Sequence, residues 1–209
     1  MIKTWIADIR PLCDPDRYMQ YYKNLPDFRK EKARRIQQHK GKMQSIGAWS
    51  LLEMIRKEYG ITDEAAFNLS HSGDYVLCSV DIQCRAGILA GCDIEQIKDA
   101  DIKVAQRFFC PSEYEEIMRQ PGKAERDDRF YRFWVLKESF MKATRMGMAL
   151  DMRSFEIQLA DPPVLLRKPE RFREPYYYRE YALPHIPYKI AICSTDRVID
   201  SEIQTELKL

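Results

Sequence analysis

Residues 87–95 read GILAGCDIE, a stretch whose second half alternates between apolar and acidic side chains. Successive side chains of a strand point to opposite faces, so its apolar members would face a core, while Asp93 and Glu95 share the other face. Two neighbouring carboxylates repel each other unless water or a shared cation screens them, and Mg²⁺ prefers oxygen ligands. The stretch therefore predicts a strand with either a metal site or an ordinary solvated acidic face.

On the amino-terminal side of this strand, the patterns predict a strand, helices and another strand. Residues 3–9 alternate apolar and polar side chains, as a strand does. Residues 26–59 carry apolar side chains at helical spacing and predict one or two amphipathic helices. A Gly-Asp turn precedes the strand-forming residues 75–81, and we expect this strand to pair with residues 87–95 as an antiparallel hairpin.

On the carboxy-terminal side, the patterns predict two helices followed by strands. Ser112 and Glu115 resemble a capping box for a helix that extends to Met118, and residues 126–144 carry a helical apolar stripe. The last dozen residues are polar, and we expect them to fray. Strands are predicted at 154–159, 176–183 and 188–194, with prolines in the turns between them.

This order of elements indicates an α+β fold with two similar α/β halves that meet near residue 100. We predict an amino-terminal half at 1–99 and a carboxy-terminal half at 100–209, although no sequence repeat links the two. The 209 residues, 45% of them apolar, suffice for one large domain or for two domains of about 100 residues each.

The composition argues against several classes of protein. With 34 basic and 32 acidic residues, the net charge of +2 favours neither nucleic acid nor a membrane surface as a partner. No stretch approaches the ~20 apolar residues of a membrane span, and the first ten residues predict a strand instead of a signal peptide. The six cysteines form no C-x-x-C pair, which indicates a reduced cytoplasmic protein.

Residues 130–143, FYRFWVLKESFMKA, predict a helix with charged residues in and beside its apolar face. Lys137 lies in the middle of that face, where a lysine must find an anion or extend to the solvent, so we include it among the candidate cofactor-binding residues. Glu138 and Lys142 are one turn apart at the edge of the face. They predict either an ordinary helical salt bridge or a pair of site residues.

Two further stretches could bind phosphate. Residues 67–72, FNLSHS, combine hydroxyls with an imidazole, and a turn of this kind can hold a phosphate through backbone and hydroxyl donors. The alternative is a plain turn, and a Ser–His hydrolase has little support because the chain has no G-x-S-x-G elbow. The basic run at 29–42 predicts either a solvated helix face or a phosphate-binding face.

Three motifs, FNLSHS at 67–72, GCDIE at 91–95 and WVLKESFMKA at 134–143, resemble those of the 4'-phosphopantetheinyl transferases of the surfactin-synthetase-activating (Sfp-like) type. That family shows F-N-x-S-H-S, then G-x-D-x-E, then W-x-x-K-E-[AS]-x-x-K-[AG], in this order. The resemblance implies two α/β halves related by a pseudo-twofold, with antiparallel sheets and the site in a cleft between them.

The resemblance also implies an activity, the transfer of 4'-phosphopantetheine from coenzyme A to a serine of an acyl, polyketide or peptidyl carrier protein, releasing 3',5'-ADP. Asp93, Glu95 and Glu138 match the family's magnesium ligands, and Mn²⁺ could take the place of Mg²⁺. Lys142 matches a lysine at the coenzyme A diphosphate. The implied catalytic residues are Glu138, which we favour as the base for the carrier serine, together with Asp93 and Lys142.

Other implied contacts with coenzyme A lie in the first half of the chain. His71 matches a histidine at the phosphates, and Ser70 lies in the same loop. The family often has an arginine near position 45 and a Gly-Lys-Pro shortly before the F-N motif, where this chain has Ser45 and ITDEAAFN. Lys40 or Lys42 would then substitute in nucleotide binding.

The implied partner is an acidic carrier protein, and the implied state is a cytoplasmic monomer that binds neither nucleic acid nor a membrane. Ile102, Phe108 and Phe109 are candidate docking residues, and Glu113 is a weaker candidate for a supporting role. Two other functions stay open at this point. One is a non-catalytic protein of the same fold that binds coenzyme A or a carrier protein, and the other is a metal-dependent phosphoesterase.

Overall fold

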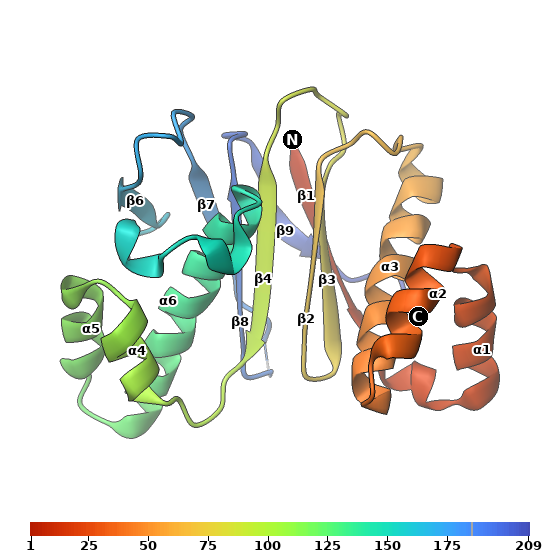
Figure 1. Ribbon diagram of the computed structural model, residues 1–209, viewed down its shortest axis with the longest axis horizontal. Helices are drawn as coiled ribbons and strands as arrows, with labels where there is room; N and C mark the ends of the chain where they lie inside the picture. The colour runs from red at the N-terminus through yellow and green to blue at the C-terminus, as the bar shows by residue number, and fades with distance from the viewer. Residues whose placement is uncertain (185) are drawn as a thin grey trace.

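The computed structural model describes residues 1–184 and 186–209, whose helices and strands form four layers (Figure 1). Two β-sheets lie in the centre, and helices cover the outer face of each sheet. The helices outside the first sheet are α1 (Pro15–Asn24), α2 (Asp27–Arg35) and α3 (His39–Tyr59). Those outside the second sheet are α4 (Ile102–Phe108), α5 (Pro111–Met118) and α6 (Lys123–Ala143).

The two sheets share one plan. The first contains, in spatial order, β2 (Phe67–Ser72), β3 (Tyr75–Asp81), β1 (Ile2–Asp8) and β9 (Ile199–Gln204). The second contains β7 (Tyr177–Tyr181), β8 (Tyr188–Ser194) and β4 (Ala90–Gln96). In the first sheet, β2 and β3 form a hairpin, and β3 pairs antiparallel with β1. In the second sheet, β7 and β8 form a hairpin, and β8 pairs antiparallel with β4. This common topology confirms the prediction of an α+β fold with two similar halves and antiparallel sheets.

The remaining elements are small, and one strand links the halves. β5 (Glu156–Gln158) and β6 (Val164–Arg167) form a separate two-stranded sheet, and short 3₁₀ helices lie at Arg10–Cys13, Gly147–Ala149 and Met152–Ser154. β9 returns to the first sheet, where it pairs in parallel with β1, while β4 lies in the second sheet. Strand pairing thus crosses the division at residues 99 and 100, and the halves 1–99 and 100–209 stay a prediction.

Three clusters of buried side chains hold the layers together. One joins α3 to the first sheet and contains Trp5 and Leu52, and another joins α6 to the second sheet and contains Phe133 and Phe140. The third cluster fills the space between the sheets, and its members include Ile2, Ile6, Leu77, Cys92, Ile94, Ile190 and Ile192. Alternate residues of β1 and β4 face this cluster, as the alternation of their sequences predicts.

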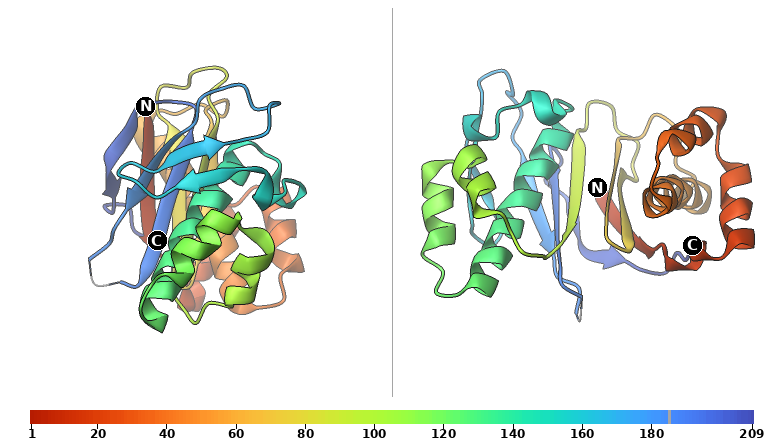
Figure 2. Two further views of the ribbon diagram at one scale, coloured as in Figure 1. Left: turned by 90° about the vertical axis from the view of Figure 1, so that its left-hand side faces the viewer. Right: turned by 60° about the horizontal axis from the view of Figure 1, so that its bottom comes forward.

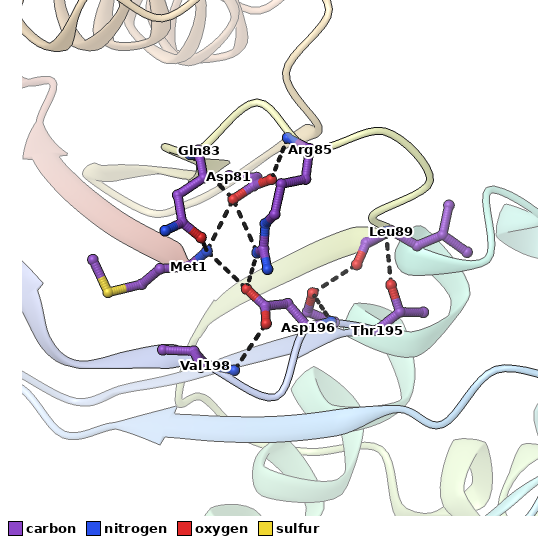
Figure 3. A network of polar contacts seen from close by, with 9 residues as sticks. Met1, Asp81, Gln83, Arg85, Leu89, Thr195, Asp196 and Val198 are labelled. Carbon is purple, nitrogen blue, oxygen red and sulfur yellow. Dashed lines mark hydrogen bonds and ion pairs between the residues drawn. The ribbon is translucent and has the colours of Figure 1, made fainter.

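A network of charged groups ties together strand ends from both sheets (Figure 3). Asp81 ends β3, Asp196 lies between β8 and β9, and both are buried. The Arg85 guanidinium donates to both carboxylates, and the Met1 amine lies 3.0 Å from Asp81 Oδ1 and 2.8 Å from Asp196 Oδ2. Burial alone would raise the pKa of Asp196, but hydrogen bonds from Arg85 and the Met1 amine lower it to about 2.

The predicted hairpin between residues 75–81 and 87–95 is wrong. β3 lies between β1 and β2, and β4 pairs with β8 instead. Closeness in sequence favours a hairpin, but it does not reveal that both edges of β3 are already paired. The helix predictions need smaller corrections, because the capping box of α5 uses Cys110 and Glu113 in place of Ser112 and Glu115. The sequence patterns do not predict α1, α4, β6 or β9.

The carboxy-terminal residues pack against the first half, contrary to the expectation that they fray. Leu209 is 1% exposed within the cluster beneath α3, and Trp5 Nε1 donates to Glu206 Oε1 at 2.9 Å. Figure 2 shows this end of the chain beside the helices of the first half. The open edge of β1 accepts β9, and this pairing outweighs the polar composition of the segment. Within the described residues, no helix has the length and apolar character that crossing a membrane requires.

Candidate functional site

The candidate site lies where β2 and β4, edge strands of different sheets, run side by side (Figure 1). Side chains of β2, in place of backbone groups, accept hydrogen bonds from alternate amides of β4. The three contacts are Cys92 N to Asn68 Oδ1 at 3.0 Å, Ile94 N to Ser70 Oγ at 3.4 Å and Gln96 N to Ser72 Oγ at 3.1 Å. We call this junction the β2–β4 seam.

The seam also fixes the direction of two hydroxyl protons. Ser70 Oγ donates to Asp93 Oδ1 at 2.8 Å, and Ser72 Oγ donates to Glu95 Oε2 at 2.7 Å. Each hydroxyl accepts from a β4 amide, so its single proton is directed at the carboxylate. The two serines therefore hold the acidic side chains of β4 in place.

This arrangement corrects the expectation that residues 67–72 form a phosphate-binding turn. These residues form strand β2, and its hydroxyls donate to carboxylates. The turn lies just beyond them, at Gly73 and Asp74. The sequence contains short polar side chains that suit a turn, but their even spacing matches alternate positions of a strand equally well.

Gly91 allows α6 to pack directly on β4. A Cβ atom at this position would lie 2.1 Å from the carbonyl oxygen of Ser139 and 2.3 Å from the amide nitrogen of Ala143. Both are backbone atoms, so no side-chain rearrangement could make room. The close approach brings Glu138 and Lys142 of α6 to the acidic face of β4.

Lys142 provides the contact that joins α6 to the seam. Its Nζ lies 2.6 Å from Asp93 Oδ1 and 3.0 Å from Ser70 Oγ. Asp93 is only 3% exposed, and its second oxygen, Oδ2, has no hydrogen-bond partner among the described residues. A buried carboxylate oxygen without a partner is costly, and it marks a position where a ligand or ion would be stabilised.

The site contains more negative than positive charge. Burial raises the pKa of Glu95 to about 7, and the charges of Asp93 and Glu138 also raise it. Burial and the charge of Asp93 raise the pKa of Glu138 in the same way. Burial alone would lower the pKa of Lys142, but the neighbouring carboxylate of Asp93 raises it. One ammonium group therefore faces three carboxylates, an arrangement that a further cation would stabilise.

The donor chemistry of these three carboxylates fits a hard divalent cation. Mg²⁺ takes oxygen ligands and is commonly bound by one or two carboxylates together with substrate phosphates. Asp93 Oδ2 has no partner among the described residues. The raised pKa values of the glutamates reflect burial first and the charge of Asp93 second, and a bound cation would favour the ionised carboxylates against both. Among the described residues, no three His, Cys, Asp or Glu side chains lie close enough to one another to hold a metal ion in their present positions. Lys142 is the cation that contacts Asp93.

His71 lies on β2 at the rim of the site, with its side chain exposed. The protein that surrounds this rim position partly desolvates the imidazole and lowers the pKa of His71, and the ammonium groups of Lys142 and Lys32 lower it further. Lys32 belongs to α2 and to the basic run, but sequence reasoning did not single it out. The sequence shows that Lys32 follows Arg29 by about one helical turn, but its proximity to His71 depends on how α2 packs. An imidazole beside two ammonium groups is a suitable neighbour for phosphate.

The two lysines predicted to substitute in nucleotide binding lie at the start of α3. Lys40 is half exposed, and its Nζ lies 2.7 Å from Asp74 Oδ1 in the turn after β2. Lys42 is partly buried on the same helix. Ser45, at the position where the family often has arginine, is buried. The binding roles of Lys40 and Lys42 stay predictions.

Lys137 does not face the site, and its predicted cofactor contact needs correction. Its side chain is fully buried, and Nζ lies 2.8 Å from the carbonyl oxygen of Met152, 3.0 Å from that of Phe155 and 2.9 Å from Glu113 Oε2. Burial lowers the pKa of Lys137, and Glu113 opposes this effect. The anion that this lysine requires is an internal carboxylate, and this pairing gives Glu113 a structural role within the second half.

The prediction that Phe109 contributes to docking is also wrong. Phe109 is 1% exposed and belongs to the cluster between α6 and the second sheet, so it offers no surface to a partner. Ile102 and Phe108, at the two ends of α4, are partly exposed. An apolar residue near a site is as often core as surface, and sequence position alone does not separate the two.

Comparison with known proteins assigns a family to this arrangement. A family model described as the 4'-phosphopantetheinyl transferase superfamily matches residues 90–193. The 4'-phosphopantetheinyl transferase Sfp of Bacillus subtilis (strain 168) is 37% identical over 144 residues, which cover 66% of this chain and 61% of that protein. The 4'-phosphopantetheinyl transferase psf-1 of Bacillus pumilus is 38% identical over 130 residues, covering 61% of this chain and 52% of that protein. The chain thus spans less than two thirds of the length of these relatives.

A solved structure shows a weaker similarity. The holo-[acyl-carrier-protein] synthase (AcpS) of Thermotoga maritima aligns with a TM-score of 0.42 and 21% identity, over 51% of this chain and 61% of that chain. Similarity at this level adds nothing to the fold or the site, which rest on the strand pairings and contacts described above.

Proposed function

The chain belongs to the 4'-phosphopantetheinyl transferase superfamily, and from this membership we propose that it transfers 4'-phosphopantetheine from coenzyme A to a serine of a carrier protein, releasing 3',5'-ADP. One observation carries the proposal. Ser70, Asp93 and Lys142 come from three separate motifs, and each pair of these residues is joined by a contact of 3.0 Å or less between polar atoms. Three stretches of chain that share no local structure thus supply one cluster of charged groups.

The proposed cofactor is Mg²⁺, or Mn²⁺, held by Asp93, Glu95 and Glu138. When bound, the ion would neutralise charge on the diphosphate of coenzyme A. The unpartnered Asp93 Oδ2 and the raised pKa values of Glu95 and Glu138 support this assignment. Ser70 and Ser72 orient the carboxylates through their hydroxyl protons.

The remaining residues act on the substrates. Lys142 would leave Asp93 for the diphosphate and place a positive charge beside the leaving 3',5'-ADP, while His71 and Lys32 line the phosphates. The carrier serine oxygen bonds to the phosphorus on the pantetheine side, and the bond from that phosphorus to the oxygen of the departing ADP breaks. Glu138 accepts the serine proton, and its raised pKa makes it a better base than an exposed glutamate.

The proposal extends to the partner and the setting. The acceptor is an acyl, polyketide or peptidyl carrier protein, and the enzyme is a monomer because one chain supplies both sides of the seam. The location is the cytoplasm, which all six cysteines support, since each is a free thiol.

Intact-protein mass spectrometry of an apo carrier protein tests the reaction. Incubation with this protein, coenzyme A and Mg²⁺ should add the mass of one phosphopantetheine group, and EDTA or Glu138→Gln should prevent the addition. Glu125→Gln, an exposed change on the same helix, is the matched control and should retain activity. If fatty-acid, polyketide and peptide carriers all keep their apo mass, the proposed transfer is wrong. Binding of coenzyme A in that case would indicate a non-catalytic protein of the same fold.

A further inference from the structure

A cavity of about 390 Å³ lies away from the β2–β4 seam, at the outer edge of the second sheet. Its walls come from the start of β6, from β7 and from the segment that joins β8 to β9. The residues that line it include Pro163, Val164, Tyr177, Arg179, Arg197 and Ile199. We call it the β7 cavity, and its volume lies within the range of small-molecule sites.

Two arginines line the β7 cavity, and neither forms an ion pair with any acidic group in the described part of the chain. Arg179 Nε is buried and has no hydrogen-bond partner there either. Glu180, the residue next to Arg179 in β7, points to the opposite face of the strand, where Arg132 donates to both of its oxygens. Glu180 is therefore not available to Arg179. A buried guanidinium donor without an acceptor indicates a missing anion.

The rest of the lining is apolar or aromatic. Pro163 is buried, Val164 is 44% exposed at the surface, and Tyr177 and Ile199 face the cavity from β7 and β9. Such walls favour a compact hydrophobic group over a second charge. The cavity therefore combines a positive end with an apolar body.

The position of the cavity in the fold is also informative. Its β7 wall occupies in the second half the place that β2 occupies in the first, because both are the outer strand of the three-strand plan. β7 meets β9 there, and Tyr181 OH donates to the carbonyl oxygen of Asp200 at 2.6 Å. The β2–β4 seam and the β7–β9 junction thus both bring edge strands of the two sheets together. The β2–β4 seam carries three carboxylates, and the β7–β9 junction carries two arginines that form no ion pair within the described residues.

We propose that the β7 cavity binds a small amphipathic anion, a carboxylate or phosphate ester borne on a compact apolar or aromatic body. Arg179 and Arg197 bind the oxyanion, and the wall formed by Pro163, Val164 and Tyr177 contacts the apolar body. The site is separate from the β2–β4 seam and does not depend on the proposed transfer.

Calorimetric titration with phenyl phosphate and with benzoate tests the site and distinguishes the two kinds of anion. At least one of them should bind the full chain more tightly than inorganic phosphate, which lacks the apolar body, and than benzyl alcohol, which lacks the charge. Arg179→Gln should weaken that binding about tenfold, since a charged hydrogen-bonding partner is lost, and Arg197→Gln should weaken it several-fold. Arg119→Gln, which removes an exposed arginine of the α5 region, should leave it unchanged.

Three further variants keep the result interpretable. Val164→Asp places a negative charge at the exposed mouth and should weaken binding without touching either arginine. Lys142→Gln removes a cation from the β2–β4 seam and should leave this binding intact, which separates the two sites. Thermal unfolding of each variant checks that the fold persists, and Arg179→Lys should recover part of the affinity. Equal binding by Arg179→Gln and the unmodified chain, or equal binding of benzyl alcohol and the anions, would overturn the proposal.

Discussion

Gly91 determines how closely helix α6 and strand β4 can approach each other. The position tolerates no Cβ atom, because two backbone atoms of α6 already lie within 2.3 Å of where it would be. Its backbone does not require a glycine, since its φ does not lie in the left-handed region. The requirement is therefore steric, and it arises only when helix and strand are packed.

Gly91→Ala is expected to destabilise the fold by about 2 kcal/mol or more, because α6 must move away from β4. The displacement should also break the contact between Lys142 and Asp93. Urea unfolding measures the loss. Gly60→Ala is a useful control, because nothing lies within 4 Å of its Cβ position and only its positive φ of 62° opposes the change. That strain costs about 1 kcal/mol, so an equal or larger loss in the control would contradict the packing argument.

Ser72→Ala is expected to raise the pKa of Glu95 above its value of about 7, since the lost hydrogen bond favours the charged carboxylate. NMR titration of the Glu95 side-chain carboxyl carbon reads this pKa directly. Ser72→Thr retains a hydroxyl and should leave the pKa near its original value. An unchanged titration in the alanine variant would show that the serine does not orient the glutamate.

At the scale of elements, the strands depend on side chains that tie their ends and edges. The β2–β4 seam replaces a backbone ladder with one amide and two hydroxyl side chains. The network in Figure 3 does the same at the strand ends, where Asp81 and Asp196 share Arg85 and the Met1 amine. Both features join the first sheet to the second without extending either sheet.

The network at Asp196 predicts a loss of stability in acid. The pKa of this carboxyl is lowered from 3.8 to about 2, so its ionised form stabilises the folded state at neutral pH. The contribution, about 2 kcal/mol, is fully present above the unfolded value and is lost as the pH falls through about 2. Urea unfolding at neutral pH and at about pH 2 should show that Asp196→Asn reduces the difference between the two conditions. Glu202→Gln, an exposed change on β9, should leave that difference as it is.

At the scale of the whole molecule, the end of the chain completes the first half. Leu209 lies in the cluster beneath α3, and its Cδ1 would contact a Cβ atom at Gly47 at 2.9 Å. β9 occupies the edge of β1 that would otherwise be open. The first half therefore depends on residues 199–209, which follow the second sheet in the sequence.

Leu209→Ala is expected to lower the free energy of unfolding by about 2 to 3 kcal/mol, as a buried leucine truncation does. Val198→Ala removes a side chain that is 55% exposed, and it should change stability by no more than about 0.5 kcal/mol. Guanidinium unfolding of the two variants compares them. Similar losses in both would indicate that the buried environment of Leu209 contributes little.

Particular residues show how far the sequence could be interpreted alone. The alternation in GCDIE predicts a strand with Asp93 and Glu95 on one face, and β4 has that form. The helical spacing of residues 130–143 predicts a helix, and α6 includes all of them. Lys137 and Glu138 are adjacent in that helix, yet one is fully buried beside Glu113 and the other faces Asp93. Helical periodicity places Lys137 in the middle of the apolar face and Glu138 at its edge, but only the packing of α5 and of the segment before β5 decides that the partner of Lys137 is Glu113 and not a ligand.

The sequence by itself determined the periodic elements, the two-half α+β class and the set of polar residues from which a site could be assembled. These features depend on local spacing and residue type, which the chain displays directly. The tertiary structure decided the partner of β4, the path of β9, the role of Lys137 and the contact of Ser72 with Glu95. Each of these depends on which distant edge or surface is free when the chain folds, and that is a property of the packed molecule.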